Sequence, residues 1–204
     1  SMQSQTLPAP LRKVVDELAQ LPGVGPKSAL RMGLTLLKWP QEKAEGLGES
    51  IKQLRRTLCL CEQCASLTDQ NPCSICADPG RDSSVLCLIP DWDSLLVMEE
   101  AGFFKGKYFV LGGLLSPLDG VNADQLELGR LEQRLAADAV QEVVLALGTT
   151  TEAEATESQL KNLLHRKYPQ LRVARLAQGI PLGAHLKFMD RETLKQSMHY
   201  RQSL

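Results

Sequence analysis

The sequence predicts a multidomain protein of the α+β class, 204 residues long. In its first part, apolar residues recur at helical spacing on both sides of a glycine-rich turn. Four closely spaced cysteines follow in two pairs. From Val85 onward, short apolar runs alternate with helical stretches, which predicts a mostly parallel sheet with helices on its faces. We therefore expect a helical part, a cysteine-rich module, an α/β domain and a helical C-terminal tail.

The N-terminal part is predicted to hold three helices. The first, at about 9–20, contains apolar residues at helical spacing: Leu11, Val14, Val15, Leu18 and Leu21. The turn at 22–25 ends this helix, and Pro26 suits the first position of a second helix that continues to Trp39. A third helix is expected at about 41–57.

Four cysteines form two C-x2-C knuckles with eight residues between them: Cys61, Cys64, Cys73 and Cys76. The two-residue spacer lets one turn present two thiolates to the same ion, and two such turns complete a tetrahedral site. We therefore predict a structural Zn²⁺ ion. Two disulfides are the alternative, but the chain has nothing that resembles a secretory leader, and a protein of the cytoplasm keeps its thiols reduced.

Two further cysteines lie outside this pattern. Cys87 lies in the apolar run VLCLI and is predicted to be a buried strand residue. Cys59 lies only two residues before Cys61, a spacing that suits a shared ion poorly. It is interpreted as a packing residue, with substitution for a knuckle ligand left open.

The α/β part alternates strands and helices. Four strands are expected, in the runs at 85–89, 108–113, 142–147 and 171–177. Three helices are expected between them, near 93–101, 124–138 and 152–168. A last helix is predicted at about 190–200. No apolar run approaches the ~20 residues of a membrane helix, so no membrane partner is expected.

Charge is distributed unevenly along the chain. Residues 1 to 56 carry nine Lys or Arg against five Asp or Glu, a net charge of +4, while the whole chain has a net charge of −1. A basic end on an acidic body favours contact with a polyanion at that end. An ordinary solvated helix surface would explain the same asymmetry.

The segment LPGVGPKSALRM is predicted to bind DNA through its phosphates. Its glycines allow a tight turn and a close approach to a surface, and the following helix would direct its exposed amides outward. The candidate DNA-binding residues are Gly23, Gly25, Lys27, Ser28 and Arg31. Such a helix-hairpin-helix binds without sequence preference. A plain turn between helices is the alternative; a nucleotide-binding P-loop does not fit, because its motif requires a glycine directly before the lysine.

These motifs, taken together, resemble the RecR family of bacterial recombination mediators over nearly the whole chain. The matching segments occur in family order: LPGVGPKSALRM, CEQC, CSIC, GKYFVLGGLLSPLDG at 106–120 and RLEQRL at 130–135.

The resemblance implies four domains and a set of partners. The domains would be a helix-hairpin-helix region at 2–57, a four-cysteine zinc finger at 58–79, a Toprim-like α/β domain at 80–178 and a C-terminal segment at 179–204. It also implies a homo-oligomer, a dimer or a tetrameric ring, that clamps double- and single-stranded DNA. RecO, and as a further candidate RecF, would be the protein partners in loading recombinase.

The Toprim-like region departs from the metal-binding pattern of Toprim enzymes. Pro90 stands where their glutamate is expected, and Gly148 and Thr150 stand where their two aspartates are expected. The carboxylates that remain there are Glu152 and Glu154. Because proline, glycine and threonine are poor ligands for a divalent cation, we predict that the protein is not an enzyme.

Other acids lie near these positions: Asp91, Asp93, Glu99 and Asp119. They could rebuild a metal site, but caps of helices and turns are the favoured interpretation, with Asp91 or Asp93 capping the helix that follows. The C-terminal segment keeps Pro181, Gly183 and the Thr193–Leu194 pair, but has Ala184 and His185 where the family usually has glycine and glutamate.

The sequence thus favours a non-enzymatic, DNA-binding recombination mediator. Two alternatives remain at this point. One is a Toprim-fold scaffold that docks proteins and has lost its DNA role. The other is a metal-dependent Toprim nuclease.

Overall fold

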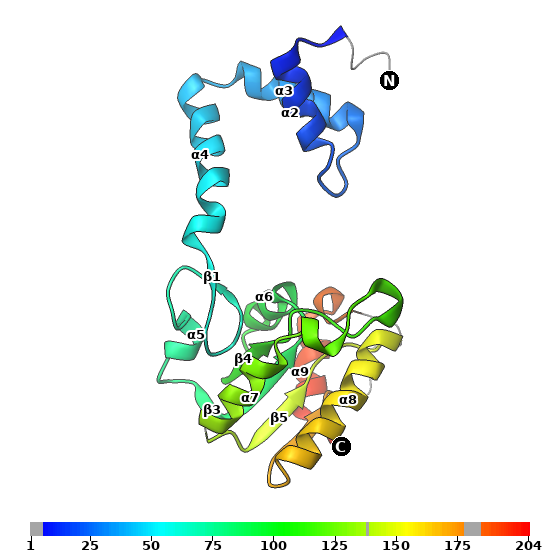
Figure 1. Ribbon diagram of the computed structural model, residues 1–204. Coiled ribbons are helices and arrows are strands. Elements are labelled where there is room, and N and C mark those ends of the chain that lie inside the picture. The colour runs from blue at the N-terminus through cyan, green and yellow to red at the C-terminus, as the bar shows by residue number, and fades with distance from the viewer. Residues whose placement is uncertain (1–5, 138, 178–184) are drawn as a thin grey trace. The chain divides into compact units, whose positions relative to one another are not determined.

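The computed structural model describes residues 6–137, 139–177 and 185–204. The chain divides between Thr57 and Leu58 into two compact units, and each is described by itself. The first unit is helical, and the second contains the cysteine knuckles and the sheet (Figure 1).

The helical unit contains α2 (Ala9–Leu18), α3 (Pro26–Lys38) and α4 (Gln41–Thr57). These bounds lie within two residues of the predicted ones. The first two helices approach closely at Gly33, where an added Cβ would lie 3.1 Å from side-chain atoms of both Leu11 and Val15. A glycine at this position therefore lets α3 pack tightly against α2.

The second unit begins with the two cysteine knuckles. The first knuckle is enclosed by a short antiparallel pair, β1 (Cys59–Leu60) and β2 (Leu67–Thr68). The second knuckle forms the one-turn helix α5 (Ser74–Ala77). No signal for the β1–β2 pair was recognised in the sequence, because each strand has only two residues.

A five-stranded sheet follows the knuckles. Its strands are β3 (Asp82–Ile89), β4 (Gly106–Val110), β5 (Glu142–Leu145), β6 (Arg172–Arg175) and β7 (Gln202–Ser203). They lie in the order β4-β3-β5-β6-β7; the first four are parallel, and β7 is antiparallel to β6. The four predicted strands and the mostly parallel sheet are thus confirmed.

Helices cover both faces of the sheet. On one face lie α7 (Leu128–Ala137) and α8 (Thr151–Lys167), and on the other lie α6 (Trp92–Ala101) and α9 (Arg191–His199). Each face of the sheet has its own apolar core, and strand β3 contributes to both. Leu86 and Leu88 belong to the core under α7 and α8, whereas Cys87 and Ile89 belong to the core under α6 and α9. Alternate residues of a strand point to opposite faces, so a continuous apolar run fills two cores.

Where the structure describes the connections, they contain 3₁₀ turns at Pro117–Asp119, Ala123–Gln125 and Leu186–Phe188. The helix predicted from residue 124 starts instead at Leu128. The reason is local: Asn122 and Gln125 cap the preceding 3₁₀ turn reciprocally, and the chain is extended at Leu126.

The described part of the C-terminal segment packs against the α/β core. Leu194 and Met198 of α9 are buried in the core that α6 covers, and the Leu204 amide donates to the Val173 carbonyl at 2.8 Å. Strand β7 was not predicted, because two polar residues carry no strand signal. The family positions Pro181, Gly183 and Ala184 lie outside the described residues. Within the described ranges, the helices are too short or too polar to cross a membrane.

An ion pair joins the end of the chain to the sheet. Arg201 donates to both carboxylate oxygens of Glu142, at 3.0 and 2.9 Å, and Glu142 is buried at the start of β5.

Replacing Arg201 with Ala is expected to lower the free energy of unfolding by about 1 to 3 kcal/mol, because Glu142 would keep a buried charge without this partner. The loss is smaller than for a fully buried pair, since 33% of the Arg201 side chain is exposed and water weakens the interaction. Chemical denaturation measures the loss. Lys195→Ala, at an exposed position of α9, is the matched control and should lower the free energy of unfolding by about 0.5 kcal/mol or less. An equal loss in both variants would contradict this role for Arg201.

Candidate metal centre and nucleic-acid interface

The four predicted ligands converge in one buried cluster. The Sγ atoms of Cys61, Cys64, Cys73 and Cys76 all lie within 4.8 Å of one another, and each residue is at most 6% exposed. Cys64 Sγ and Cys73 Sγ are 3.6 Å apart. Sulfurs around tetrahedral zinc, with bonds of about 2.3 Å, are separated by about 3.8 Å. The quartet therefore fits a Zn²⁺ ion, as the spacing predicted.

Backbone hydrogen bonds shape the two knuckles. In the first, the Cys61 amide donates to the Ser66 carbonyl and the Ala65 amide donates to the Cys61 carbonyl, both at 2.8 Å. Ala65 takes the left-handed conformation, with φ at 61°, and so closes the turn. In the second, Cys73 caps α5, and its sulfur accepts from the Cys76 amide. These turns direct all four thiols toward one point.

Three of the four thiols lie so close together that each shifts the pKa of the others. The hydrogen bond with Cys73 raises the pKa of Cys64 to about 12, and the same contact lowers the pKa of Cys73. Contacts with Cys64 and Cys73, together with burial, raise the pKa of Cys76. Four thiolates therefore do not coexist here without a cation, and a divalent metal supplies the missing positive charge.

The other two cysteines lie apart from this cluster. Cys87 is fully buried in β3, as predicted, and its burial raises the pKa of its thiol to about 12. Cys59 is exposed, so its interpretation as a packing residue was wrong. Its thiol donates to the Thr68 carbonyl at 3.5 Å, across the β1–β2 pair, and it does not belong to the metal-binding quartet.

The glycine hairpin forms between α2 and α3. Gly23 takes φ at +78°, a left-handed conformation that favours glycine, and the Val24 amide donates to the Leu21 carbonyl at 3.1 Å. Gly25 is the N-cap residue of α3, and Pro26 is its first residue. Because glycine has no side chain, Gly25 leaves the first-turn amides without a side-chain cap.

The candidate DNA-binding side chains lie on the first turns of α3. Lys27, Ser28 and Arg31 are all exposed. Ser28 and Arg31 also border a groove of about 500 Å³ in the helical unit, whose other lining is mostly apolar and includes Trp39 and Leu47. Hairpin amides, a hydroxyl and two cations therefore share one end of α3.

The residues that stand in place of the Toprim metal ligands have structural roles. Pro90 is buried directly after β3. Gly148 takes φ at +98° after β5, and Thr150 caps α8 by accepting from the Ala153 amide at 3.1 Å. Glu152 lies in the first turn of that helix, where the helix dipole stabilises a negative charge.

The neighbouring acids have structural partners. Asp91 caps α6, as predicted, by accepting from the Ser94 amide and hydroxyl. Asp119 accepts from the Ser116 hydroxyl at 2.9 Å. Glu99 differs from the prediction: it caps nothing and instead pairs with Arg81. Among the described residues, the cysteine quartet is the group of metal-ligating side chains that the structure brings together.

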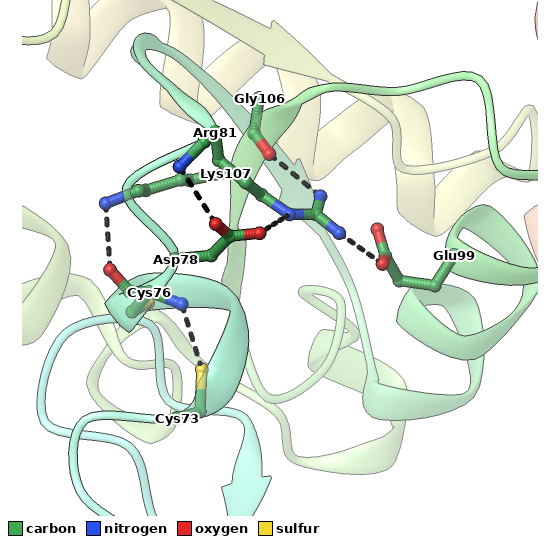
Figure 2. A network of polar contacts seen from close by, with 8 residues as sticks. Cys73, Cys76, Asp78, Arg81, Glu99, Gly106 and Lys107 are labelled. Atoms are coloured by element: carbon green, nitrogen blue, oxygen red, sulfur yellow. Dashed lines mark hydrogen bonds and ion pairs between the residues drawn. The ribbon is translucent and has the colours of Figure 1, made fainter.

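A polar network, not predicted from the sequence, joins the second knuckle to the sheet (Figure 2). Lys107 of β4 donates to the Cys76 carbonyl at 2.9 Å. Arg81 donates to the Gly106 carbonyl at 3.0 Å and forms ion pairs with Glu99 and Asp78. Apart from Asp78 and Arg81, the partners are 18 to 31 residues apart in the sequence, so no local pattern could have indicated these contacts.

The fold and the metal centre define a class of protein: a hairpin-bearing helical unit joined to a four-cysteine zinc finger that is docked on an α/β domain. Family models match the same parts in the same order. They describe a RecR helix-hairpin-helix, a RecR zinc finger domain with four cysteines, a Toprim domain and a RecR C-terminal region, and they match residues 11–55, 58–78, 84–177 and 179–202.

Similar proteins cover almost the whole chain. The recombination protein RecR of Nitratidesulfovibrio vulgaris is 58% identical over 98% of this chain and 100% of its own. That of Maridesulfovibrio salexigens is also 58% identical, with the same coverage, and that of Myxococcus xanthus is 42% identical over 97% of this chain and 99% of its own. The chain therefore belongs to the RecR family of recombination proteins, which are non-enzymatic mediators.

We expect the purified protein to bind one zinc ion per chain, and Cys64→Ser to lose most of it, because three sulfurs no longer close the tetrahedron. Elemental analysis after dialysis measures the metal. Cys59→Ser is the matched control, since Cys59 lies outside the quartet, and it should keep the ion. Loss of zinc from Cys59→Ser, with retention in Cys64→Ser, would overturn the assignment of ligands.

Proposed function

We propose that this member of the RecR family binds double- and single-stranded DNA, irrespective of sequence, as an oligomeric clamp. One observation carries the proposal: Lys27, Ser28 and Arg31 are exposed at the uncapped start of α3, directly after the glycine hairpin. Backbone amides and cations at a helix N-terminus bind phosphate oxygens and do not distinguish bases.

Charge limits the affinity of a single chain. The net charge of +4 on the N-terminal part is small beside the six to ten phosphate contacts of a tightly bound protein. Several subunits on one duplex would add their contacts, because each subunit that binds raises the effective concentration of the next. A clamp made of several copies therefore suits these residues better than a monomer does.

An apolar stripe on α4 supports a homo-oligomer. Leu47, Ile51 and Leu54 recur at helical spacing and are 41%, 64% and 56% exposed, and no residue of α4 is buried. A stripe of this kind on a helix is typical of a face that packs against another helix. A second copy of the chain, which carries the same stripe, would bury it.

Protein partners complete the proposed role. We expect the protein to work in the cytoplasm with RecO, and with RecF as a further candidate, in delivering recombinase to single-stranded DNA. Membership of the RecR family supports these partners.

Replacing Lys27 with Ala should weaken binding to every DNA sequence alike, because the side chain that is removed binds phosphate. Fluorescence anisotropy of labelled DNA at ~50 and ~200 mM salt should show a shallower salt dependence, by about 0.9 in the log–log slope for each phosphate that the variant no longer neutralises. Lys38→Ala, at the other end of α3, is the matched control and should leave binding unchanged. If only Lys38→Ala weakens binding, the hairpin does not bind the DNA; if the parent does not bind at all, the docking-scaffold alternative is favoured.

Replacing Ile51 with Asp should shift the protein toward smaller species in size-exclusion chromatography with light scattering, because a buried carboxylate opposes association. Ser50→Asp, one residue away on a different side of α4, adds the same charge and should leave the mass unchanged. An unchanged mass in Ile51→Asp would remove α4 from the subunit interface.

A further inference from the structure

Two arginines of α7 reach the zinc finger. Arg130 donates to the Cys61 carbonyl at 3.1 Å. Arg134 donates to the Gln63 carbonyl at 2.6 Å, and the same nitrogen lies 3.7 Å from Cys76 Sγ as a hydrogen-bond donor. The two arginines are four residues apart and so lie on the same side of the helix. Arg134 therefore contacts both knuckles and one metal-ligating sulfur.

The other side of α7 is anchored in the sheet domain. Leu131 is fully buried in the core that α7 and α8 cover, and Leu128 and Leu135 pack against the same core. Because α7 is held from this side, its arginines are presented to the knuckles in a defined position. Arg134 itself is only 5% exposed, so its guanidinium reaches the finger away from bulk water.

Charge explains why an arginine is useful at this position. Four thiolates around one divalent ion leave a net charge of −2 in a cluster that is at most 6% exposed. A guanidinium stays protonated at all relevant pH values, and its planar donors can contact a carbonyl and a sulfur together. Hydrogen bonds to ligand atoms are the usual means by which surrounding residues hold a metal site.

We propose that Arg134 is a positioning residue of the zinc centre: it offsets the negative charge of the thiolates, fixes Cys76 Sγ and ties the metal site to α7. The zinc finger is then not an independent module, because part of its metal affinity comes from a helix of the α/β domain. Arg130 has a lesser role, since it contacts a carbonyl of the first knuckle and not a sulfur.

The test compares zinc affinity in full-length Arg134→Met, Arg134→Lys and the parent, by competition with a chromophoric chelator. Arg134→Met should bind zinc about 10- to 100-fold more weakly, which is the usual effect of removing a partner of a metal ligand. Arg134→Lys keeps the charge but not the planar donor geometry of the guanidinium, so its affinity should lie between those of the parent and Arg134→Met.

Cobalt substitution adds a readout that a merely structural role would not change. A hydrogen bond stabilises the sulfur lone pairs, so its removal in Arg134→Met should move the thiolate-to-cobalt charge-transfer band to longer wavelength. Leu135→Ala, which disturbs the packing of α7 and leaves both arginines in place, is the matched control. It should lower the free energy of unfolding and leave this band unmoved.

Two results would overturn the proposal. One is parent-like zinc affinity and an unmoved band in folded Arg134→Met. The other is an equal loss of zinc affinity in Leu135→Ala, which would mean that lower stability of the fold alone explains the weaker zinc binding. If Arg134→Met does not fold, Arg134→Lys decides: the proposal requires faster zinc release than from the parent, and release at the parental rate contradicts it.

Discussion

Closure of four thiols around one divalent cation is the constraint on which the second unit depends. The four cysteines form a small buried cluster of their own and pack against little else that is apolar. The two knuckles together comprise only about twenty residues and bury too little surface to fold alone, so metal binding supplies the missing stability. The contacts that dock the knuckles then become possible, because the carbonyls of Cys61, Gln63 and Cys76 point toward donors on α7 and β4.

The docked finger also completes one edge of the sheet. The Val110 amide of β4 donates to the Cys64 carbonyl at 2.8 Å, and Lys107 of the same strand reaches the Cys76 carbonyl. An edge strand with free amides pairs readily with other chains, and a covered one does not. The other edge ends in β7, a strand of only two residues, which offers little for further pairing. The metal centre therefore stabilises the finger and, through it, keeps the β4 edge of the sheet from pairing with other chains.

The sequence predicted the elements whose signal is local. Continuous apolar runs located β3 to β6, helical periodicity located α2 and α3, and the C-x2-C spacing identified the zinc ligands. It did not predict β7, because Gln202 and Ser203 are polar and the strand depends on pairing with β6. The contacts of Arg130 and Arg134 were also missed, since 69 and 71 residues separate them from their carbonyl partners on the first knuckle. Cys59 was assigned to packing because its spacing from Cys61 suits a shared ion poorly, yet the short β1–β2 pair leaves it exposed.

The most direct test of the account is hydrogen–deuterium exchange of the full chain before and after zinc is removed with a chelator. If the metal centre supports both the finger and the sheet edge, amides of 58–79 should lose protection together with those of β4 and α7, while α2 and α3 exchange as before. Loss of protection confined to the knuckles, with β4 and α7 unchanged, would contradict the account. The zinc finger would then be an independent module that merely lies against the α/β domain.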